Sequence, residues 1–537
     1  MVAHNAVNCL WEGFIMTFIA SPYQKAIFRF VKDSKNGSAI INACAGSGKS
    51  TTAVKAAKRV PFEKDSLFLA FNKAIANELR ERLPEHVPAM TLNGLGHRAW
   101  MKFRDGNIKL NSSKTFDVIK AMTDNNSKHR NEDINPWEMR RLGSQIRQLV
   151  RVAKAFGIVP NGVDGAEGLL EDSYQTWEQM IEHFDISFGG GERTLNPPNP
   201  EKDKYTAIDY AREVLKVSLG LWDEIDFDDQ LYLPVVFNAP TSKYHVIFVD
   251  EAQDLSAIQR RLVRKALRNK GGRLFAIGDA RQAIYGWRGA DVNSMAMIAE
   301  EFGCASLPLT ISYRCPKAVV REAQKYCPEI EASETAEEGI VEDRGLYDPK
   351  IFQPGDMVLC RFNAPLVRVA YRLIGGGVPA AIVGRDISGN LAALVKKLGS
   401  TTIPGLCNDL REWRTKEIER LKSKDENADT TKVEDKFEML HSFIQCAVPK
   451  TVQELLGMIE RLFGDGSPET VNLSTVHKAK GLEADRVFLL NFHVTNNYAR
   501  QPWQIEQEKC IRYVAVTRAR KALYFISSGR ETADLWT

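Results

Sequence analysis

The sequence predicts an α/β protein with two parallel-sheet cores, each interrupted by a mostly helical insertion. Short apolar runs recur along the 537 residues, and helix-like stretches separate them. Runs without polar alternation are typical of buried parallel strands, and the helices between them supply the crossover connections. The runs also fall into two groups, one before residue 280 and one after residue 355. Two cores are therefore the economical interpretation.

The predicted strands follow directly from these runs. The first group comprises residues 38–43, 66–71, 244–250 and 273–279. The second group comprises residues 356–362, 379–384, 470–476, 486–492 and 522–527. Most runs are followed by a turn and then a helix-like stretch, so each group indicates successive βαβ units.

Helical and often highly charged stretches divide both cores, and the chain returns to strand-like runs after each. We therefore predict a first core at residues 1–95 and 205–310, with a helical insertion at 96–204. The second core is predicted at residues 311–390 and 465–537, with a reduced helical insertion at 391–464.

Composition restricts function only weakly. The net charge of +4 comes from 72 basic and 68 acidic residues, so a groove for a polyanion would need local clustering of charge. Nine scattered cysteines without a C-x-x-C pair indicate ordinary thiols in a reducing compartment and no metal cluster. The apolar stretch at residues 10–20 is too short to span a bilayer and lacks a signal-peptide pattern. We expect a cytoplasmic protein (bacterial, or viral in a bacterial host; nuclear if eukaryotic) that does not contact a membrane.

A phosphate-binding loop is predicted at residues 43–51, ACAGSGKST, between a strand-like run and a helix-like stretch. Small residues let backbone amides wrap phosphate oxygens, and the start of a helix favours negative charge. Lys49 would reach the terminal phosphates, and the Ser50 hydroxyl would bind Mg²⁺. Ala43 stands where the strict pattern has glycine. The predicted nucleotide-binding residues of the loop are Ala45, Gly46, Ser47, Gly48, Lys49, Ser50 and Thr51.

The sequence VDEAQD at residues 249–254 ends a predicted strand with two carboxylates, Asp250 and Glu251. Asp250 would hold the metal directly or through water, and Glu251 would orient and deprotonate the attacking water. An isolated acidic pair would more simply be a solvated turn. A phosphate loop in the same chain instead favours hydrolysis of ATP with Mg²⁺. Kinases, transporters and remodelling ATPases share these two elements, so the work done with ATP stays open at this point.

Further motifs carry a resemblance to a known family. They include GDARQAIYGWRGAD at 278–291, VNLSTVHKAKGLEADRVFLL at 471–490 and YVAVTRARKAL at 513–523. Shorter ones are PYQKAI at 22–27, FNKAIANEL at 71–79, FDDQL at 227–231, LTISYRCP at 309–316 and LCRFNAP at 359–365. In this order they resemble the motifs of UvrD/Rep-like superfamily 1 DNA helicases, with wording most like the helicase core of F-box DNA helicases. The resemblance implies that both cores are RecA-like.

The resemblance also implies roles around the nucleotide. Gln24 would read the adenine edge, and Tyr313 would stack on the base. Gln282 would sense the γ-phosphate, and Glu483 would hold the ribose. Arg314 and Arg518 resemble the two arginines contributed by the second core, whose planar, permanently charged groups suit a transferring phosphoryl group.

Contacts to nucleic acid are implied in the same way. Trp287 is the main candidate for stacking on bases, with Phe71 and Tyr285 in support, since aromatic faces grip any base. Further contacts are expected from Arg288, Thr91, Asn93, Arg361, Asn363, Thr475, His477 and Lys478. Several family members carry His where Asn93 stands. Phe71 also ends a buried strand, and for His477 a tautomer-fixed core histidine is an equal alternative.

The resulting expectation is an ATP-dependent helicase or translocase that moves 3′ to 5′ on single-stranded DNA and unwinds duplex or displaces bound proteins. Single-stranded and tailed duplex DNA are the expected partners, with single-strand-binding, repair or recombination proteins as further ones, and the protein is expected to be a monomer. An RNA-directed helicase and a nucleic-acid clamp with a regulatory ATPase remain alternatives. The insertion at 391–464 is shorter than its UvrD counterpart, and little chain follows the last motif. How a duplex would be opened therefore stays open.

Overall fold

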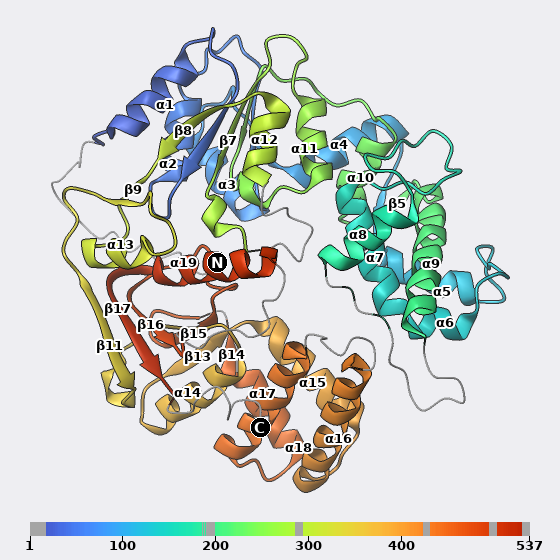
Figure 1. Cartoon of the computed structure of the whole chain (residues 1–537), viewed down its shortest axis with the longest axis vertical. Coiled ribbons are helices and arrows are strands. Elements are labelled where there is room, and N and C mark those ends of the chain that lie inside the picture. Colours follow the sequence, from blue (N-terminus) through green and yellow to red (C-terminus); the bar gives the residue numbers. More distant parts are fainter. Residues whose placement is uncertain are drawn as a thin grey trace, which may run out of the picture.

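The computed structural model describes residues 18–184, 186, 188, 199–284, 294–422, 430–464, 466–492 and 502–528. Two lobes lie one above the other, each built around a parallel sheet, and a helical subdomain lies beside the first lobe (Figure 1). The predicted fold class is thereby confirmed. In the described part of the chain, no helix combines the length and the apolar character needed to cross a membrane.

The sheet of the first lobe has the strand order β3-β2-β6-β7-β1-β8, and every neighbouring pair is parallel. The strands are β1 (Ala39–Ala43), β2 (Ser66–Ala70), β3 (Ala89–Thr91), β6 (Val246–Val249), β7 (Arg273–Gly278) and β8 (Ala305–Leu309). The residues of β2, β6 and β7 are all buried, which explains why their sequences read as continuous apolar runs. The carboxyl ends of the strands meet at one edge, which is where open α/β sheets bind ligands.

Helices flank this sheet and begin at local capping signals. In α1 (Pro22–Lys32), Ser21 and Gln24 form a reciprocal capping box. In α3 (Lys73–Arg82), the Asn72 side chain caps the first turn. The helix α2 (Lys49–Ala57) instead begins at Gly48, whose backbone is left-handed. The remaining helices of the lobe are α11 (Ala257–Ala266) and α12 (Ser294–Phe302).

The first helical subdomain is larger than predicted. It contains α4 (Leu92–Arg104), α5 (Lys114–Thr123), α6 (Pro136–Arg141), α7 (Gly143–Phe156), α8 (Tyr174–His183), α9 (Pro200–Gly220) and α10 (Asp229–Val236), with a small pair of strands β4 (Lys109–Leu110) and β5 (Glu224–Ile225). The predicted boundary at 204–205 is wrong, because α9 runs unbroken through it and packs on α5 and α7. The chain returns to the first sheet only at β6.

Buried charge ties this subdomain together. The Nζ of Lys114 lies 2.7 Å from Asp229, and the Nζ of Lys154 lies 2.8 Å from both Asp226 and Asp229. All four side chains are buried. Removing one partner of such a cluster leaves an uncompensated buried charge, so each carboxylate matters for folding. Asp229 of the FDDQL motif therefore has a structural role.

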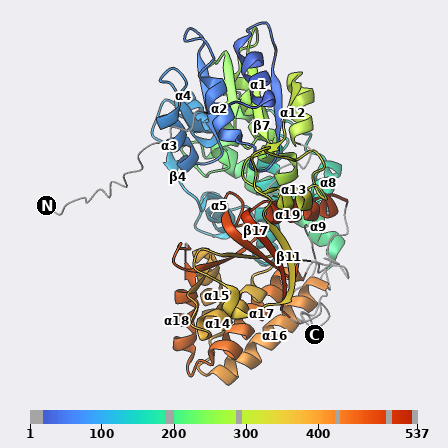
Figure 2. The same cartoon turned by 90° about the vertical axis from the view of Figure 1, so that its left-hand side faces the viewer.

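The sheet of the second lobe has the order β11-β17-β16-β12-β15-β13-β14, again parallel throughout. Its strands are β11 (Ile340–Leu346), β12 (Met357–Cys360), β13 (Ala380–Val383), β14 (Phe463–Gly464), β15 (Val471–Thr475), β16 (Ala484–Leu490) and β17 (Ala519–Ser527). A separate parallel pair, β9 (Ile311–Ser312) and β10 (Glu331–Ala332), lies where the chain passes between lobes. Figure 2 shows α13 (Lys317–Ala323) and α19 (Pro502–Val516) between the two lobes.

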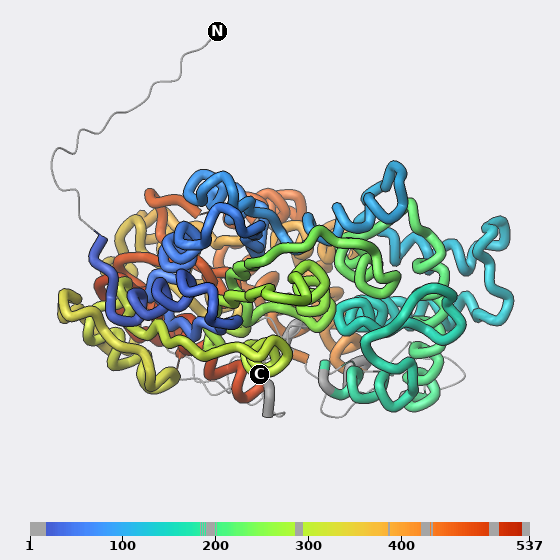
Figure 3. Tube along the Cα trace, turned by 90° about the horizontal axis from the view of Figure 1, so that it is seen from above, coloured from blue at the N-terminus to red at the C-terminus, as the bar shows by residue number. Residues whose placement is uncertain are grey.

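The second helical subdomain contains α15 (Arg385–Leu398), α16 (Ile403–Lys422), α17 (Thr431–Ala447) and α18 (Val452–Leu462). The predicted boundary at 390–391 is wrong, because it falls inside α15, which packs on α16 and α18. The core helix α14 (Ala364–Gly375) packs on α17 and joins this subdomain to its sheet. Seen from above, the first helical subdomain extends to one side of the stacked lobes (Figure 3).

Candidate functional site

The phosphate loop leaves β1 at the sheet's carboxyl edge and is wedged between the lobes. Gly46 and Gly48 have φ angles of 72° and 77°, a region that favours glycine. A Cβ on Gly46 would lie 2.5 Å from the Cβ of Arg314, so no larger residue fits there. The amide of Ala45 donates to the Tyr513 hydroxyl at 2.8 Å, and the Tyr313 amide donates to the Gly46 carbonyl at 2.9 Å. The second lobe thus holds the loop's backbone directly.

The loop's own polar groups fit a polyphosphate with a divalent ion. The Ser47 hydroxyl is fully buried and has no hydrogen-bond partner among the residues that the structure describes. A buried hydroxyl without a partner costs stability unless a ligand satisfies it. Burial raises the pKa of the Asp250 carboxyl and the nearby Ser50 hydroxyl opposes that rise, so a hydroxyl and a carboxylate lie together where Mg²⁺ is expected. No group of three or more His, Cys, Asp or Glu in the described chain could hold a metal. Asp250, Ser50 and phosphate oxygens are the donors that fit Mg²⁺ here.

The two carboxylates at the end of β6 have opposite electrostatic surroundings. Burial raises the pKa of Asp250, and the neighbouring Glu251 carboxylate raises it further, which suits a site that awaits a cation. Burial also opposes the ionisation of Glu251, but Lys49 and Lys480 outweigh it and lower its pKa. The Nζ of Lys49 lies 3.6 Å from the Glu251 carboxylate. Glu251, at a strained φ of 50°, is thus an ionised carboxylate aimed into the site.

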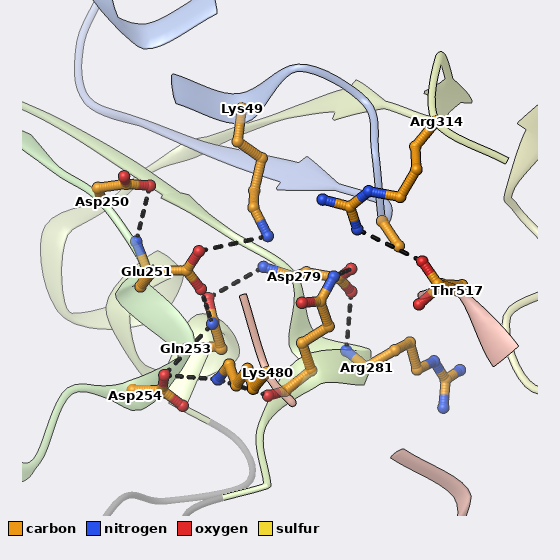
Figure 4. A network of polar contacts seen from close by, with 12 residues as sticks. Lys49, Asp250, Glu251, Gln253, Asp254, Asp279, Arg281, Arg314, Lys480 and Thr517 are labelled. Atoms are coloured by element: carbon orange, nitrogen blue, oxygen red, sulfur yellow. Dashed lines mark hydrogen bonds and ion pairs between the residues drawn. The ribbon is translucent and has the colours of Figure 1, made fainter. Parts of the chain in front are cut away.

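A chain of polar contacts continues from Glu251 to the second lobe (Figure 4). The Gln253 side chain donates to Glu251 and accepts from the Asp279 amide at 3.0 Å. Gln282, in turn, donates to the Asp279 carboxylate at 2.6 Å. Lys480 of the second lobe lies 2.7 Å from Asp254 and donates to the Gln282 carbonyl at 2.8 Å.

Gln253 and Lys480 had no predicted role. Gln253 lies in the DEAQD motif and Lys480 in the HKAKG segment of the motif at residues 471–490. Gln253 is the uncharged polar residue of an acidic motif, and Lys480 is one of two lysines in a basic motif, so neither motif indicates a specific partner. Their partners are distant in sequence, so only the fold reveals them.

Two arginines of the chain's second half face the loop. Arg314 pairs with Glu483 at 2.5 Å, and one of its nitrogens lies 3.4 Å from the Thr517 carbonyl. Arg518 is almost fully buried and donates to the carbonyls of Val514 and Leu482. Burial, and then the positive charge of Arg314, lower the pKa of Arg518 to about 10. Two cations that repel each other in a pocket fit a polyanionic ligand between them.

Both lobes line one pocket of about 670 Å³, a volume within the range of small-molecule sites. Its predicted members are Gly46, Ser47, Gly48, Lys49, Ser50, Thr51, Phe71, Glu251, Gln282, Tyr313, Arg314, Glu483 and Arg518. Arg518 therefore faces the same pocket as Lys49. Arg520 also lines it and lies 3.6 Å from Glu483, a contact that was not predicted.

Gln24 lies beside this pocket but not in its lining. Its side-chain oxygen accepts from the Ser21 backbone amide at 3.0 Å, and its side-chain nitrogen donates to the Thr52 hydroxyl at 2.9 Å. The side chain is buried. In this state the Gln24 amide holds α1 against α2, and its role toward adenine stays a prediction. Tyr313 is half exposed at the pocket, as a stacking residue would be.

A smaller pocket of about 300 Å³ lies between the first lobe and its helical subdomain. Its lining includes Phe71, Asn93, Arg151, Asp228 and Gln259. Phe71 and Asp254 line both pockets. The Asn93 side chain donates to the Phe227 carbonyl at 2.7 Å, while Thr91 caps α4 by accepting from Gly94. Phe71, Thr91 and Asn93 gather because β2 and β3 are neighbouring strands.

The residues of the second lobe that are predicted to contact DNA also follow neighbouring β-strands. Cys360 of β12 pairs with Thr475 of β15, so the residues that follow both strands share one edge. Arg361 pairs with Glu508 at 2.9 Å, and Asn363 donates to Asp435 at 3.0 Å. Further candidates on this edge are Thr475, His477 and Lys478. Thr475 is buried, and the Nζ of Lys478 lies beside Gly384. Tyr285, Trp287 and Arg288 lie outside the described residues.

Comparisons with known proteins agree with this geometry. The family model of the UvrD/REP helicase N-terminal domain matches residues 24–303, and that of the UvrD-like helicase C-terminal domain matches residues 385–530. F-box DNA helicase protein 1 of Schizosaccharomyces pombe is 25% identical over 525 residues, which cover 90% of this chain and 55% of the relative.

Two further relatives extend the comparison. F-box DNA helicase 1 of Gallus gallus is 26% identical over 528 residues, covering 91% of this chain and 47% of the relative. DNA helicase II of Escherichia coli is 24% identical over 303 residues, covering 53% and 37%. The chain thus spans about half the length of the F-box helicases it matches.

Proposed function

The chain belongs to the UvrD/Rep-like helicase family, and on that premise we propose that it is an ATP-driven motor on single-stranded DNA. It moves 3′ to 5′ along the strand and unwinds duplex DNA or displaces bound proteins. The observation that carries this proposal is the shared pocket. Lys49 and Glu251 from the first lobe face Arg314, Arg518 and Glu483 from the chain's second half around one volume of about 670 Å³.

The protein's groups divide the work of hydrolysis between them. The loop amides and Lys49 bind the phosphates, and Glu251 accepts a proton from the attacking water. Arg314 and Arg518 stabilise the charge on the transferring phosphoryl group, a contribution worth about three to five orders of magnitude in rate. Mg²⁺ held by Ser50 and Asp250 would neutralise phosphate charge.

Movement follows from the position of the pocket between the lobes. Full catalysis needs groups of both lobes, so ATP favours a closed seam and its hydrolysis products release it. The candidate DNA contacts come from both lobes: Phe71 and Asn93 line the smaller pocket of the first lobe, and Arg361 and His477 follow neighbouring strands of the second sheet. Opening and closing of the seam would then change the distance between the two sets of contacts that hold one DNA strand.

Two alternatives lead to different measurements. An RNA-directed helicase of the same family would show ATPase activity stimulated more strongly by single-stranded RNA than by single-stranded DNA. A clamp whose ATPase regulates residence would keep strand-stimulated hydrolysis without unwinding or displacement. The complete set of Lys49, Glu251, Arg314 and Arg518 favours a motor over a clamp.

The decisive experiment compares unwinding of duplexes that carry a 3′ or a 5′ single-stranded tail. We expect ATP-dependent unwinding from the 3′ tail, and none in a Lys49→Ala variant. Preferential unwinding from the 5′ tail would reject the polarity. Stimulated ATPase without unwinding or streptavidin displacement on either substrate would support the clamp.

The setting of this activity is proposed from the sequence and family alone. We propose a monomer in a reducing compartment, cytoplasmic or, in a eukaryote, nuclear. Its partners would be single-stranded and tailed duplex DNA and proteins of repair, replication or recombination. In support, the eight described cysteines are all thiols.

A further inference from the structure

One face of the first helical subdomain carries a row of exposed aromatic and basic side chains. The helices α6 and α7 follow each other almost without a break, since the Leu142 amide donates to Glu138 and the Ile146 amide to Leu142. Positions three or four residues apart lie on one helical face. This rule places in one row, which we call the α6–α7 ridge, Trp137, Arg140, Ser144, Arg147 and Arg151. All five are exposed.

The opposite face of the same two helices is apolar. It buries Met139, Leu142, Ile146, Leu149 and Val150 against the rest of the subdomain. The ridge is therefore not needed for the subdomain's core. Its side chains have a span of 14 residues, which corresponds to about 21 Å along a helix.

Aromatic rings accompany the arginines of the ridge. Trp137 is 53% exposed, and the guanidinium of Arg141 lies over its ring at 5.0 Å. Phe116 of α5 is also 53% exposed, and Arg147 lies 6.0 Å from its ring centre. Exposed rings next to guanidinium groups are the combination that binds nucleic-acid strands without reading sequence.

Three nearby carboxylates contact groups other than the five ridge side chains. Glu138 accepts from the Tyr210 hydroxyl and lies 3.6 Å from Lys202, and Asp203 binds Arg141. Asp117 accepts from Asn111. None of the five ridge positions is acidic. The ridge thus presents positive charge to solvent, with Asp228 of the neighbouring pocket as the acid at its inner end.

The ridge is continuous with the candidate strand site. Its last residue, Arg151, lines the 300 Å³ pocket together with Phe71 and Asn93. We propose that the α6–α7 ridge binds an unpaired nucleic-acid strand that continues from this pocket along the helical subdomain. The proposal rests on the proposed function and extends it to a surface outside the family motifs. An unpaired strand is favoured over a duplex, because exposed rings stack only on bases that are not already stacked in a helix.

The test is a variant that replaces three side chains of the ridge, Trp137→Ala with Arg140→Gln and Arg147→Gln. It leaves the lining of the 300 Å³ pocket unchanged. All three side chains are exposed, so the variant is expected to fold. A control variant carries Arg29→Gln, Arg321→Gln and Arg411→Gln, which remove arginines from other elements. Binding of short and long oligothymidylates and of a blunt duplex is measured by fluorescence anisotropy over a range of salt concentrations.

We expect the ridge variant to lose at least about fivefold in affinity for the long oligothymidylate, the equivalent of one lost stacking contact. Its salt slope should fall by about 1.4, since each lost phosphate contact on a single strand removes about 0.7. The short oligothymidylate, which fills only the pockets, should bind as it does to the unaltered protein.

Three results would contradict the proposal that the α6–α7 ridge binds an unpaired strand. They are an unchanged salt slope and length dependence, an equal loss in the control variant, and a loss seen only with blunt duplex. If single strands stimulate the ATPase of the unaltered protein while the ridge variant binds them normally, only the proposal for the ridge is wrong. If no strand stimulates that ATPase, the proposed function fails as well.

Discussion

Gly46 lies where the phosphate loop of the first lobe meets the second lobe. Its φ is +72°, and an added Cβ would lie 2.5 Å from the Cβ of Arg314 and 2.7 Å from the Ser312 hydroxyl. A Gly46→Ala change therefore introduces both backbone strain and a clash across the seam. We expect ATPase activity to fall at least tenfold and the protein to lose about 1–3 kcal/mol of stability.

A matched glycine gives the control for this change. Gly37 has no atom within 4 Å of an added Cβ and no left-handed backbone. Gly37→Ala should leave both ATPase activity and thermal unfolding unchanged. Equal ATPase activities of the two variants would show that the seam at Gly46 tolerates movement.

His477 has an unusual protonation equilibrium. Burial, then the charges of Arg361 and Lys480, lower its pKa to about 3. In the unfolded chain the ring titrates near its ordinary pKa of about 6.5. The unfolded chain thus binds more protons between these values, so stability present above pH 6.5 is lost as pH falls toward 3. At neutral pH the ring is uncharged, and any strand contact it makes is a hydrogen bond.

The His477→Asn variant removes this titration. We expect its free energy of unfolding, measured with urea at several pH values, to fall less steeply than that of the unaltered protein between about pH 6 and pH 4. Identical slopes for the two proteins would mean that His477 is readily protonated in the folded state.

At the scale of the element, α19 holds a predicted strand contact. Its Glu508 pairs with Arg361 at 2.9 Å, so a phosphate that binds Arg361 must compete with this carboxylate. A Glu508→Gln variant should therefore bind single-stranded DNA more tightly, by up to about fivefold, the effect of an ion pair worth up to about 1 kcal/mol. The affinity is measured by anisotropy, with Glu412→Gln on α16 as a control. Weaker binding would show that Glu508 orients Arg361 for the strand instead of competing with it.

Elements were predictable where their signal is local. All nine predicted strands are present, because buried parallel strands are continuous apolar runs. The missed strands lack that signal: six of them, including β3, have only two or three residues, β8 contains Pro308, and β11 is a charged edge strand. The boundary at 204–205 failed because α9 is assigned to its subdomain by packing on α5 and α7, which local patterns do not encode.

The residues of the candidate site were likewise predictable only where the signal is local. Lys49, Ser50, Asp250 and Glu251 were identifiable because one short motif supplies each chemical role. The partners that tune these residues lie far away in sequence. Lys480 reaches Asp254 across more than two hundred residues, and no pattern within either motif indicates the pair.

For the whole molecule, Lys480 is a contact between the lobes that we expect to link hydrolysis to the proposed DNA site. It belongs to the second lobe and lies 2.7 Å from Asp254, which lines both the nucleotide pocket and the smaller pocket beside Phe71. It also donates to the Gln282 carbonyl, while Gln282 contacts Asp279. The Lys480 and Asp254 side chains are 9% and 3% exposed, so either would be costly to leave unpaired.

Lys480→Gln and Asp254→Asn should therefore each reduce the stimulation of ATPase by single-stranded DNA, and the double variant should lose less than the sum. The expected coupling free energy is about 0.5–3 kcal/mol, as for residues in direct contact. It is measured as a double-mutant cycle on the ratio of stimulated to unstimulated kcat. Lys416→Gln with Glu412→Gln, an exposed pair on α16, is the control cycle and should give a coupling near zero. Strictly additive losses at Lys480 and Asp254 would mean that the lobes communicate through other contacts of the seam, such as that between Ala45 and Tyr513.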